Sequence, residues 1–243
     1  MRNIAYLIVF LINLVYLVGC SQKSPTKTIL LKTIKLEVPE PSGLTFSTDL
    51  KTLWTVSDEN STAYNLNTDG KILKSFKLNG FDLEGITALN DSVLVVIFER
   101  TREVAIVDPS GREIKRYKLD IPGNDNKGIE GIAFDPASEH FFIIKEKNPC
   151  LLFEYDFDFN LLKKDTLTFS SDVSGLYYDK ANNFLWILSD ENSSVNIIDM
   201  QREVQQKIYF NLSQPEGITY NPDEKLLYVI SDSEEEMYIF QIE

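Results

Sequence analysis

A short pattern, in which Ser or Glu precedes Gly and an aliphatic residue, occurs five times along this 243-residue chain. The glycines of the five copies are Gly43, Gly85, Gly131, Gly175 and Gly217. They are therefore 42 to 46 residues apart. A nearly constant period of this length is typical of repeat architectures, in which every repeat forms one supersecondary unit.

Each glycine is followed, 14 or 15 residues later, by an acid that ends an apolar run. These acids are Asp58, Glu99, Glu146, Asp190 and Asp232. Two further strand-like runs complete each unit, for example residues 63–66 and 72–78, joined through Asp69-Gly70, which suits a tight hairpin. Four short strands per repeat predict one β-propeller blade. A solenoid is the alternative, but solenoid repeats are usually shorter.

The two ends of the chain favour the propeller. The fifth unit, from Gly217 to Glu243, has room for only three strands, whereas an unassigned strand-like run, Ile29 to Val38, precedes the first unit. A propeller can close its ring by pairing strands from both termini, which leaves no free sheet edge. We therefore predict an all-β, five-bladed β-propeller with four-stranded blades over residues 29–243, closed by its N-terminal strand.

The first residues resemble a bacterial lipoprotein signal peptide. Met1-Arg2-Asn3 precedes a mostly apolar run that is too short for a typical membrane span and ends at Gly19-Cys20. We expect residues 1–19 to be removed, Cys20 to be lipidated and residues 20–28 to form a tether to the membrane. Ser21 favours the outer over the inner membrane, and a plain N-terminal membrane anchor is the alternative.

Composition excludes some partners. The formal net charge of −13 offers no basic stripe for phosphates, so nucleic acid is not expected as a partner. With Cys20 lipidated, Cys150 remains as the one thiol and cannot form an internal disulfide. We expect a monomer.

Propeller topology brings the recurring acids together. The innermost strand of a blade begins on the face where the second strand ends, because the two strands are antiparallel. Glu84, Glu130 and Glu216, with Ser42 and Ser174 at the equivalent positions, should form an inner ring on that face. The acids that end the second strands should lie beside or outside this ring.

Converging carboxylates repel and raise one another's pKa unless a cation compensates them. Ca²⁺ suits such a site because it takes about 6–8 oxygen ligands in flexible geometry, whereas no His/Cys cluster supports zinc. The predicted metal ligands are Glu84, Glu130, Glu216, Asp58, Glu146, Asp190 and Asp232. The alternative is structural: Gly fits a crowded strand start, and Asp caps a turn.

Positive residues fall near the same face. With Glu99 they form a candidate site for a small anionic ligand such as phosphate, although ordinary salt bridges would also explain them. These residues are Arg100, Lys127, Lys145 and Lys147. The only histidine, His140, is expected on the opposite face, which argues against a Ser-His-Asp arrangement.

Several motifs together resemble one family. They are Pro41-Ser42-Gly43-Leu44-Thr45, Asp82-Leu83-Glu84-Gly85-Ile86, Lys127-Gly128-Ile129-Glu130-Gly131-Ile132-Ala133-Phe134-Asp135, Lys145-Glu146-Lys147-Asn148-Pro149 and Pro215-Glu216-Gly217-Ile218. On these residues, nearly all of 29–243 is similar to the SdiA-regulated proteins, bacterial envelope β-propellers. The resemblance implies a propeller linked to calcium, with no settled biochemical activity. A more distant likeness, in Glu-Gly at the inner strand, is to calcium-dependent lactonase and phytase propellers.

Two functions remain open. One is a lipid-anchored, calcium-binding module that recognises a small ligand or an envelope protein. The other is a calcium-dependent hydrolase of the phosphoesterase or lactonase type, which would use the acidic rim of the channel.

Overall fold

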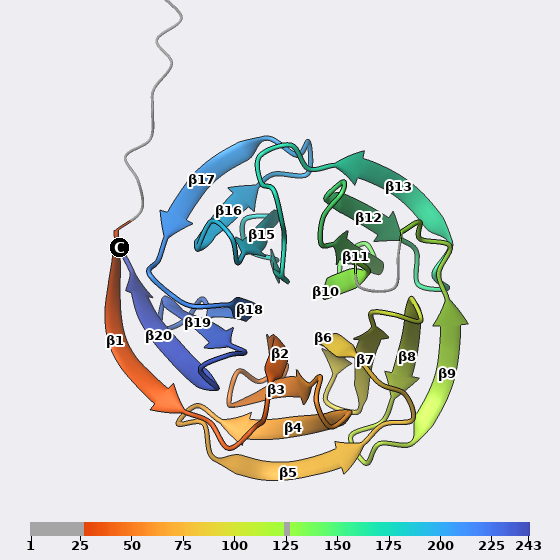
Figure 1. The fold of residues 1–243 in the computed structure, drawn as a ribbon, viewed down its shortest axis with the longest axis horizontal. Coiled ribbons are helices and arrows are strands. Elements are labelled where there is room, and N and C mark those ends of the chain that lie inside the picture. The colour runs from red at the N-terminus through yellow and green to blue at the C-terminus, as the bar shows by residue number, and fades with distance from the viewer. Residues whose placement is uncertain (1–26, 124–126) are drawn as a thin grey trace, which may run out of the picture.

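The computed structural model describes residues 27–123 and 127–243, and within these ranges every regular element is a β-strand. Five four-stranded antiparallel sheets surround a central axis as the blades of a propeller (Figure 1). The predicted fold class is therefore confirmed. No helix in the described ranges is long and apolar enough to cross a membrane. The predicted signal peptide and Cys20 lie outside the described residues.

The blades follow one another along the chain, each running from its innermost to its outermost strand. Blade 1 comprises β2 (Pro41–Phe46), β3 (Thr52–Ser57), β4 (Thr62–Asn67) and β5 (Ile72–Lys77). Blade 2 comprises β6 (Leu83–Asn90), β7 (Val93–Phe98), β8 (Glu103–Val107) and β9 (Glu113–Lys118). Blade 3 comprises β10 (Ile129–Asp135), β11 (His140–Lys145), β12 (Leu151–Tyr155) and β13 (Leu161–Thr166). Blade 4 comprises β14 (Gly175–Asp179), β15 (Phe184–Ser189), β16 (Ser194–Ile198) and β17 (Val204–Tyr209). Blade 5 comprises β18 (Pro215–Asn221), β19 (Leu226–Ser231), β20 (Glu236–Ile242) and β1 (Thr28–Lys35).

Blade 5 joins the two ends of the described chain. Strand β1 pairs antiparallel with β20 and forms the outer edge of the blade, as predicted (Figure 1). The strand ends at Lys35, earlier than the predicted Val38, but Leu36 and Val38 are buried in the contact with blade 1. Ring closure therefore uses both a strand ladder and apolar packing.

The hydrophobic core is divided among the contacts between neighbouring blades. Along β11, Phe141 and Ile143 pack with residues of blade 2, whereas Phe142 and Ile144 pack with residues of blade 4. This alternation follows from the two-residue period of a strand, which sends successive side chains to opposite faces. The second strands therefore read as continuous apolar runs, because both of their faces are buried.

The recurring glycines surround the propeller axis, where the five innermost strands approach most closely. We call Gly43, Gly85, Gly131, Gly175 and Gly217 the glycine ring. A Cβ on Gly43 would lie 2.7 Å from the Cα of Gly85, and one on Gly217 would lie 2.9 Å from the carbonyl carbon of Gly43. The cavity along the axis at this level has a volume of only about 10 Å³, which is no more than one water molecule needs. The glycines are therefore required mainly by crowding, and the ring separates the two ends of the channel.

Candidate functional site

Acidic side chains gather at the end of the channel where the innermost strands begin. We call this group the acidic rim, and it includes one carboxylate that the sequence analysis did not select, Asp82. Its members are Asp58, Asp82, Glu84, Glu99, Glu130, Glu146, Asp190, Glu216 and Asp232. Antiparallel pairing in each blade brings the start of the innermost strand beside the end of the second strand, which explains the grouping.

A break in strand register positions the three inner glutamates. In blade 2, Leu83 pairs with Phe98 and Gly85 pairs with Ile97, so Glu84 has no partner across the ladder. Glu130 and Glu216 are skipped in the same way in blades 3 and 5. A β-bulge of this kind turns a side chain out of the alternating pattern of its strand. The bulge therefore explains why glutamates at these positions contribute to the rim.

The serines at the two equivalent positions have a different role. In blade 1 the skipped residue is Gly43 instead, and Ser42 donates a hydrogen bond from Oγ to the backbone oxygen of Glu84, at 3.0 Å. In blade 4 the register has no break, and Ser174 donates from Oγ to the backbone oxygen of Pro215, at 2.6 Å. Both serines thus tie one innermost strand to the next.

Burial and mutual repulsion raise the pKa of the inner glutamates. For Glu130, burial is the main cause, followed by the charges of Glu84, Glu99 and Glu216. For Glu84, burial is again first, followed by the charge of Asp58. The pKa of Glu216 is also raised, by burial and then by Asp190 and Asp232. Each inner glutamate is therefore affected by the charges of other rim acids.

The outer acids respond in the same direction. Burial and then the charges of Asp82 and Glu40 raise the pKa of Asp58 to about 6. Burial raises the pKa of Asp190 and of Asp232 as well, with neighbouring acids adding to the effect. One carboxylate oxygen of Asp232, Oδ1, is buried and has no hydrogen-bond partner among the described residues. The rim is consequently a region where negative charge is under-compensated.

The carboxylates of Asp58, Asp82 and Glu84 form one compact group within the rim. One oxygen from each lies within 4.8 Å of the others, at the junction of blades 1 and 2. Three carboxylate oxygens at this separation suit a hard cation that prefers oxygen ligands. This cluster is the tightest candidate metal site that the described part of the chain offers.

Asp82 could not be selected from the repeat, because the residue type at the equivalent position differs between blades. Asp82 lies two residues before Glu84, the residue that directly precedes the ring glycine of blade 2. The equivalent positions in blades 1 to 5 are occupied by Glu40, Asp82, Gly128, Asp172 and Gln214. In blade 4, Asp172 caps a turn by accepting hydrogen bonds from Ser189 Oγ at 2.6 Å and from the backbone nitrogen of Asp190 at 2.8 Å. The missed signal was an acid two residues before a rim glutamate, which occurs in blade 2 alone.

The predicted basic residues have partners of several kinds. Arg100 Nε lies 3.1 Å from Asp82 Oδ1, and Lys147 forms an ion pair with Glu146. Lys145 is only 2% exposed and donates hydrogen bonds to the backbone oxygens of Lys147 and Pro149. Burial, together with nearby cations that include Lys127, lowers the pKa of Lys145. Arg100 therefore lies beside the acids at the junction of blades 1 and 2. Lys127 lies near Lys145 of blade 3, and Lys147 reaches Glu191 of blade 4, at 3.7 Å.

Glu99 is a buried acid of the rim that is held by a backbone hydrogen bond. Its Oε1 accepts a hydrogen bond of 2.6 Å from the backbone nitrogen of Gly128. Burial raises the pKa of Glu99 to about 7, although the Gly128 hydrogen bond opposes the shift. Glu99 thus titrates near neutral pH.

Histidine and cysteine side chains are catalytic in many proteins, but His140 lies far from the acidic rim and Cys150 is poorly reactive. His140 begins β11 at the opposite end of the channel, where its Nδ1 lies 2.9 Å from Glu154 Oε1. Cys150 is buried, and burial raises the pKa of its thiol to about 11. A thiol with so high a pKa is a poor nucleophile at neutral pH. The rim is therefore a site of carboxylates and ammonium or guanidinium groups.

Comparison with protein families gives a match over nearly the whole chain. The family model described as SdiA-regulated matches residues 26–241. The match spans all five blades.

Proposed function

The chain belongs to the SdiA-regulated family, and on that premise we propose that it is a lipid-anchored β-propeller of the bacterial envelope that binds calcium through its acidic rim. The proposal includes a role in recognising a ligand or partner rather than in turnover. The observation that carries it is the Asp58, Asp82 and Glu84 cluster, whose oxygens lie within 4.8 Å of one another.

The chemistry of the donors fits calcium. The rim supplies carboxylates, and backbone carbonyls and water can complete the roughly 6–8 oxygen ligands that Ca²⁺ accepts. Glu130 and Glu216 would add negative charge around the cluster, since their electrostatic effects reach Glu84. Arg100 offsets part of that charge through Asp82, so a bound cation would compete with this ion pair. Calcium would replace costly repulsion with favourable coordination.

A calcium-dependent gain in thermal stability tests this proposal. If Ca²⁺ binds the folded state alone, the melting temperature should rise with concentration, and the stabilisation should reach roughly 2.7 kcal/mol at about 100 times the dissociation constant. A triple variant, Glu84→Gln, Glu130→Gln and Glu216→Gln, keeps side-chain size but removes charge. It should lose the calcium response, and without calcium it should be as stable as the natural chain or more so.

The matched control is Glu203→Gln. Glu203 is exposed immediately before β17, and its carboxylate has no hydrogen bond or ion pair with the described residues. This variant should respond to calcium as the natural chain does. An unchanged melting temperature with calcium, combined with lower stability of the triple variant, would show that the three glutamates are structural.

Membrane attachment has its own test. Gly19-Cys20 offers the small residue and the thiol that lipoprotein processing requires. Membrane attachment of the mature chain would depend on the acyl chains carried by Cys20. We expect Cys20→Ala to yield an unprocessed precursor or a protein that leaves the membrane fraction, as measured by fractionation and intact mass. A processed form with unchanged mass and unchanged fractionation would rule out lipidation at Cys20.

A further inference from the structure

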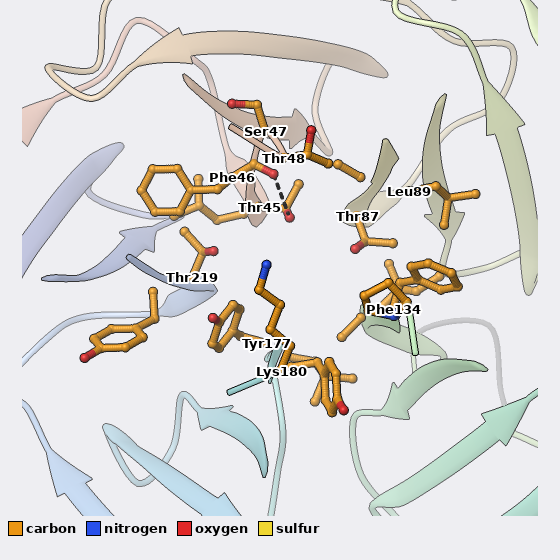
Figure 2. Close-up of a pocket in the computed structure, with 18 of the residues that line it drawn as sticks. Thr45, Phe46, Ser47, Thr48, Thr87, Leu89, Phe134, Tyr177, Lys180 and Thr219 are labelled. Atoms are coloured by element: carbon orange, nitrogen blue, oxygen red, sulfur yellow. Dashed lines mark hydrogen bonds between the residues drawn. The ribbon is translucent and has the colours of Figure 1, made fainter. Parts of the chain in front are cut away.

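A second recess lies at the end of the channel remote from the acidic rim. The innermost strands end around a cavity of about 330 Å³, and the turns that follow them complete its walls (Figure 2). The glycine ring lies between this cavity and the rim. The volume is near the lower limit of the roughly 300–1,000 Å³ typical of small-molecule pockets. We call this recess the hydroxyl pocket.

Hydroxyl groups recur around this pocket with the periodicity of the blades. The second residue after each ring glycine is Thr45, Thr87, Ala133, Tyr177 or Thr219. All of these residues line the cavity, and Figure 2 shows the three threonines and Tyr177 on different sides of it. Four of the five positions therefore place a hydroxyl-bearing side chain in the wall.

Two of these residues are buried, and their hydroxyls have no partner among the described residues. Thr219 is 1% exposed and Thr87 is 6% exposed, yet neither hydroxyl forms a hydrogen bond with any residue that the structure describes. The hydroxyl of Thr45 makes only a long contact, 3.4 Å, to the backbone oxygen of Phe46. The oxygens of Thr87 and Thr219 are not among the fully enclosed unpartnered atoms of the described residues, so they are open to the cavity, where a ligand or ordered water can form hydrogen bonds with them.

Among the described residues, one charged side chain lines the pocket. Lys180, from the turn between β14 and β15, extends its ammonium group toward the centre of the cavity (Figure 2). The carboxylate of its neighbour Asp179 is occupied by the turn, accepting hydrogen bonds from Ala181 N at 3.0 Å and Asn182 Nδ2 at 2.7 Å. Lys180 has no ion pair or hydrogen bond within the described ranges. It is thus an available cation in a protein with a net charge of −13.

The remaining walls are largely apolar. Leu44, Phe46, Phe134 and Leu176 line the cavity together with Tyr220. Tyr220 stacks on Trp186, with ring centroids 4.9 Å apart, which fixes that side of the wall. Such walls suit an aromatic or short aliphatic body.

We propose that the hydroxyl pocket binds an organic monocarboxylate with a compact apolar body. Its carboxylate would pair with Lys180 and accept hydrogen bonds from the unpartnered threonine hydroxyls, while its body would contact Phe46, Phe134 or Tyr220. A carboxylate suits one ammonium group better than a phosphate dianion does, because Lys180 is the one cation that the described part of the chain places in the wall of this cavity. The site does not depend on calcium, because the glycine ring separates it from the rim.

Titration with 3-phenylpropanoate tests the assignment, and 3-phenylpropanamide serves as the uncharged ligand of the same shape. The full chain should bind the carboxylate at least about tenfold more tightly than the amide, as measured by calorimetry and ligand-observed NMR. Lys180→Gln should weaken carboxylate binding by about tenfold or more, whereas Lys180→Arg should retain most of it. The double variant Thr87→Val and Thr219→Val should also bind more weakly.

Lys164→Gln is the matched control, because Lys164 is an exposed lysine on β13 that has no ion pair within the described part of the chain. It should bind as the natural chain does, and binding should be unchanged in the presence of EGTA. Equal affinity for acid and amide, or no effect of Lys180→Gln, would overturn the assignment. So would the absence of binding up to about 10 mM, weaker than a specific site requires. Carboxylate binding that persists in EGTA would support the pocket assignment independently of whether the rim binds calcium.

Discussion

Glu84, Glu130 and Glu216 are held where carboxylates are costly. Each is skipped by the ladder of its own blade, and burial is the largest cause of its raised pKa. A protein core usually compensates buried charge with a cation or with hydrogen bonds. In this rim the guanidinium group of Arg100 is paired with Asp82 rather than with one of the three glutamates. The residues themselves therefore favour either proton uptake or cation binding.

This balance predicts a pH dependence of stability. Asp58 and Glu99 have folded-state pKa values of about 6 and about 7, above their ordinary values of 3.8 and 4.5. A raised carboxyl pKa stabilises the fold at low pH, and this stabilisation is lost as pH rises through the folded value. Without calcium, the free energy of unfolding should fall by on the order of 1 kcal/mol between about pH 5 and pH 7.5, after allowance for solvent screening.

Urea unfolding in EGTA across this pH range measures the effect. Calcium should reduce the loss, because the cation binds the deprotonated rim, and its apparent affinity should weaken toward pH 5 as protons compete. Asp58→Asn should remove part of the pH dependence. Calcium-free stability that is constant or rises from pH 5 to 7.5 would contradict the account of a strained rim.

At the residue scale, the sequence reveals positions that recur in every blade, whereas residues that differ between blades are not revealed by the repeat. The acids of the repeated motif could be placed on one face because strand direction alone fixes that face. Asp82 could not be selected, because its equivalents in the other blades are Glu40, Gly128, Asp172 and Gln214. Its contact with Asp58 crosses between two blades, so a pattern within a single blade does not reveal it.

At the scale of elements, β1 is the strand on which ring closure depends. It pairs with β20 along its length, with one register shift between Leu30 and Lys32. At the adjacent end, Lys27 Nζ lies 2.9 Å from Glu243 Oε2. The sequence predicted this strand from a count of strands in the last unit. The exact end was not predictable, because Leu36 and Val38 remain buried after the ladder has stopped.

Removing residues 29–38 should destabilise the propeller severely. Burial of Leu36 and Val38 alone contributes roughly 3–6 kcal/mol, a large part of the roughly 5–15 kcal/mol net stability of a typical domain. The truncated chain should aggregate or melt at a much lower temperature, because an unpaired β20 edge is a template for association.

A synthetic peptide covering residues 27–38 provides the control. Added in trans, it should restore a monomeric, cooperatively melting protein by completing the sheet, whereas a scrambled peptide should not. Size-exclusion chromatography and thermal melting distinguish these outcomes. A truncated chain that stays monomeric with unchanged melting would mean that β1 does not close the ring.

The bulges at the start of β6, β10 and β18 are a second element-scale feature. A Glu-Gly pair in the sequence does not show which residue of the pair is skipped, and in blade 1 the skipped residue is Gly43. The outcome depends on contacts between innermost strands, where a Cβ on Gly43 would lie 3.0 Å from the backbone oxygen of Glu84. Local sequence is therefore insufficient, because neighbouring blades decide the register.

At the scale of the whole molecule, the glycine ring divides the channel into two chemically different ends. One end gathers carboxylates, and the other presents hydroxyls, aromatic rings and Lys180. The sequence predicted the acidic end because acids recur in phase with the repeat. It did not predict the hydroxyl pocket, since Thr and Tyr are common in strands and Lys180 occurs in one turn only. Only the assembled ring brings these residues together.

The central claim is that the acidic rim holds a calcium ion, and a crystal structure of the full chain grown in calcium tests it most directly. An anomalous difference map should show a peak among the carboxylates of Asp58, Asp82 and Glu84, with metal–oxygen distances of about 2.3–2.6 Å and about 6–8 oxygen ligands. The peak should be absent from crystals of the triple Glu→Gln variant grown identically. A calcium-grown crystal of the natural chain with no anomalous peak anywhere in the rim would contradict the account.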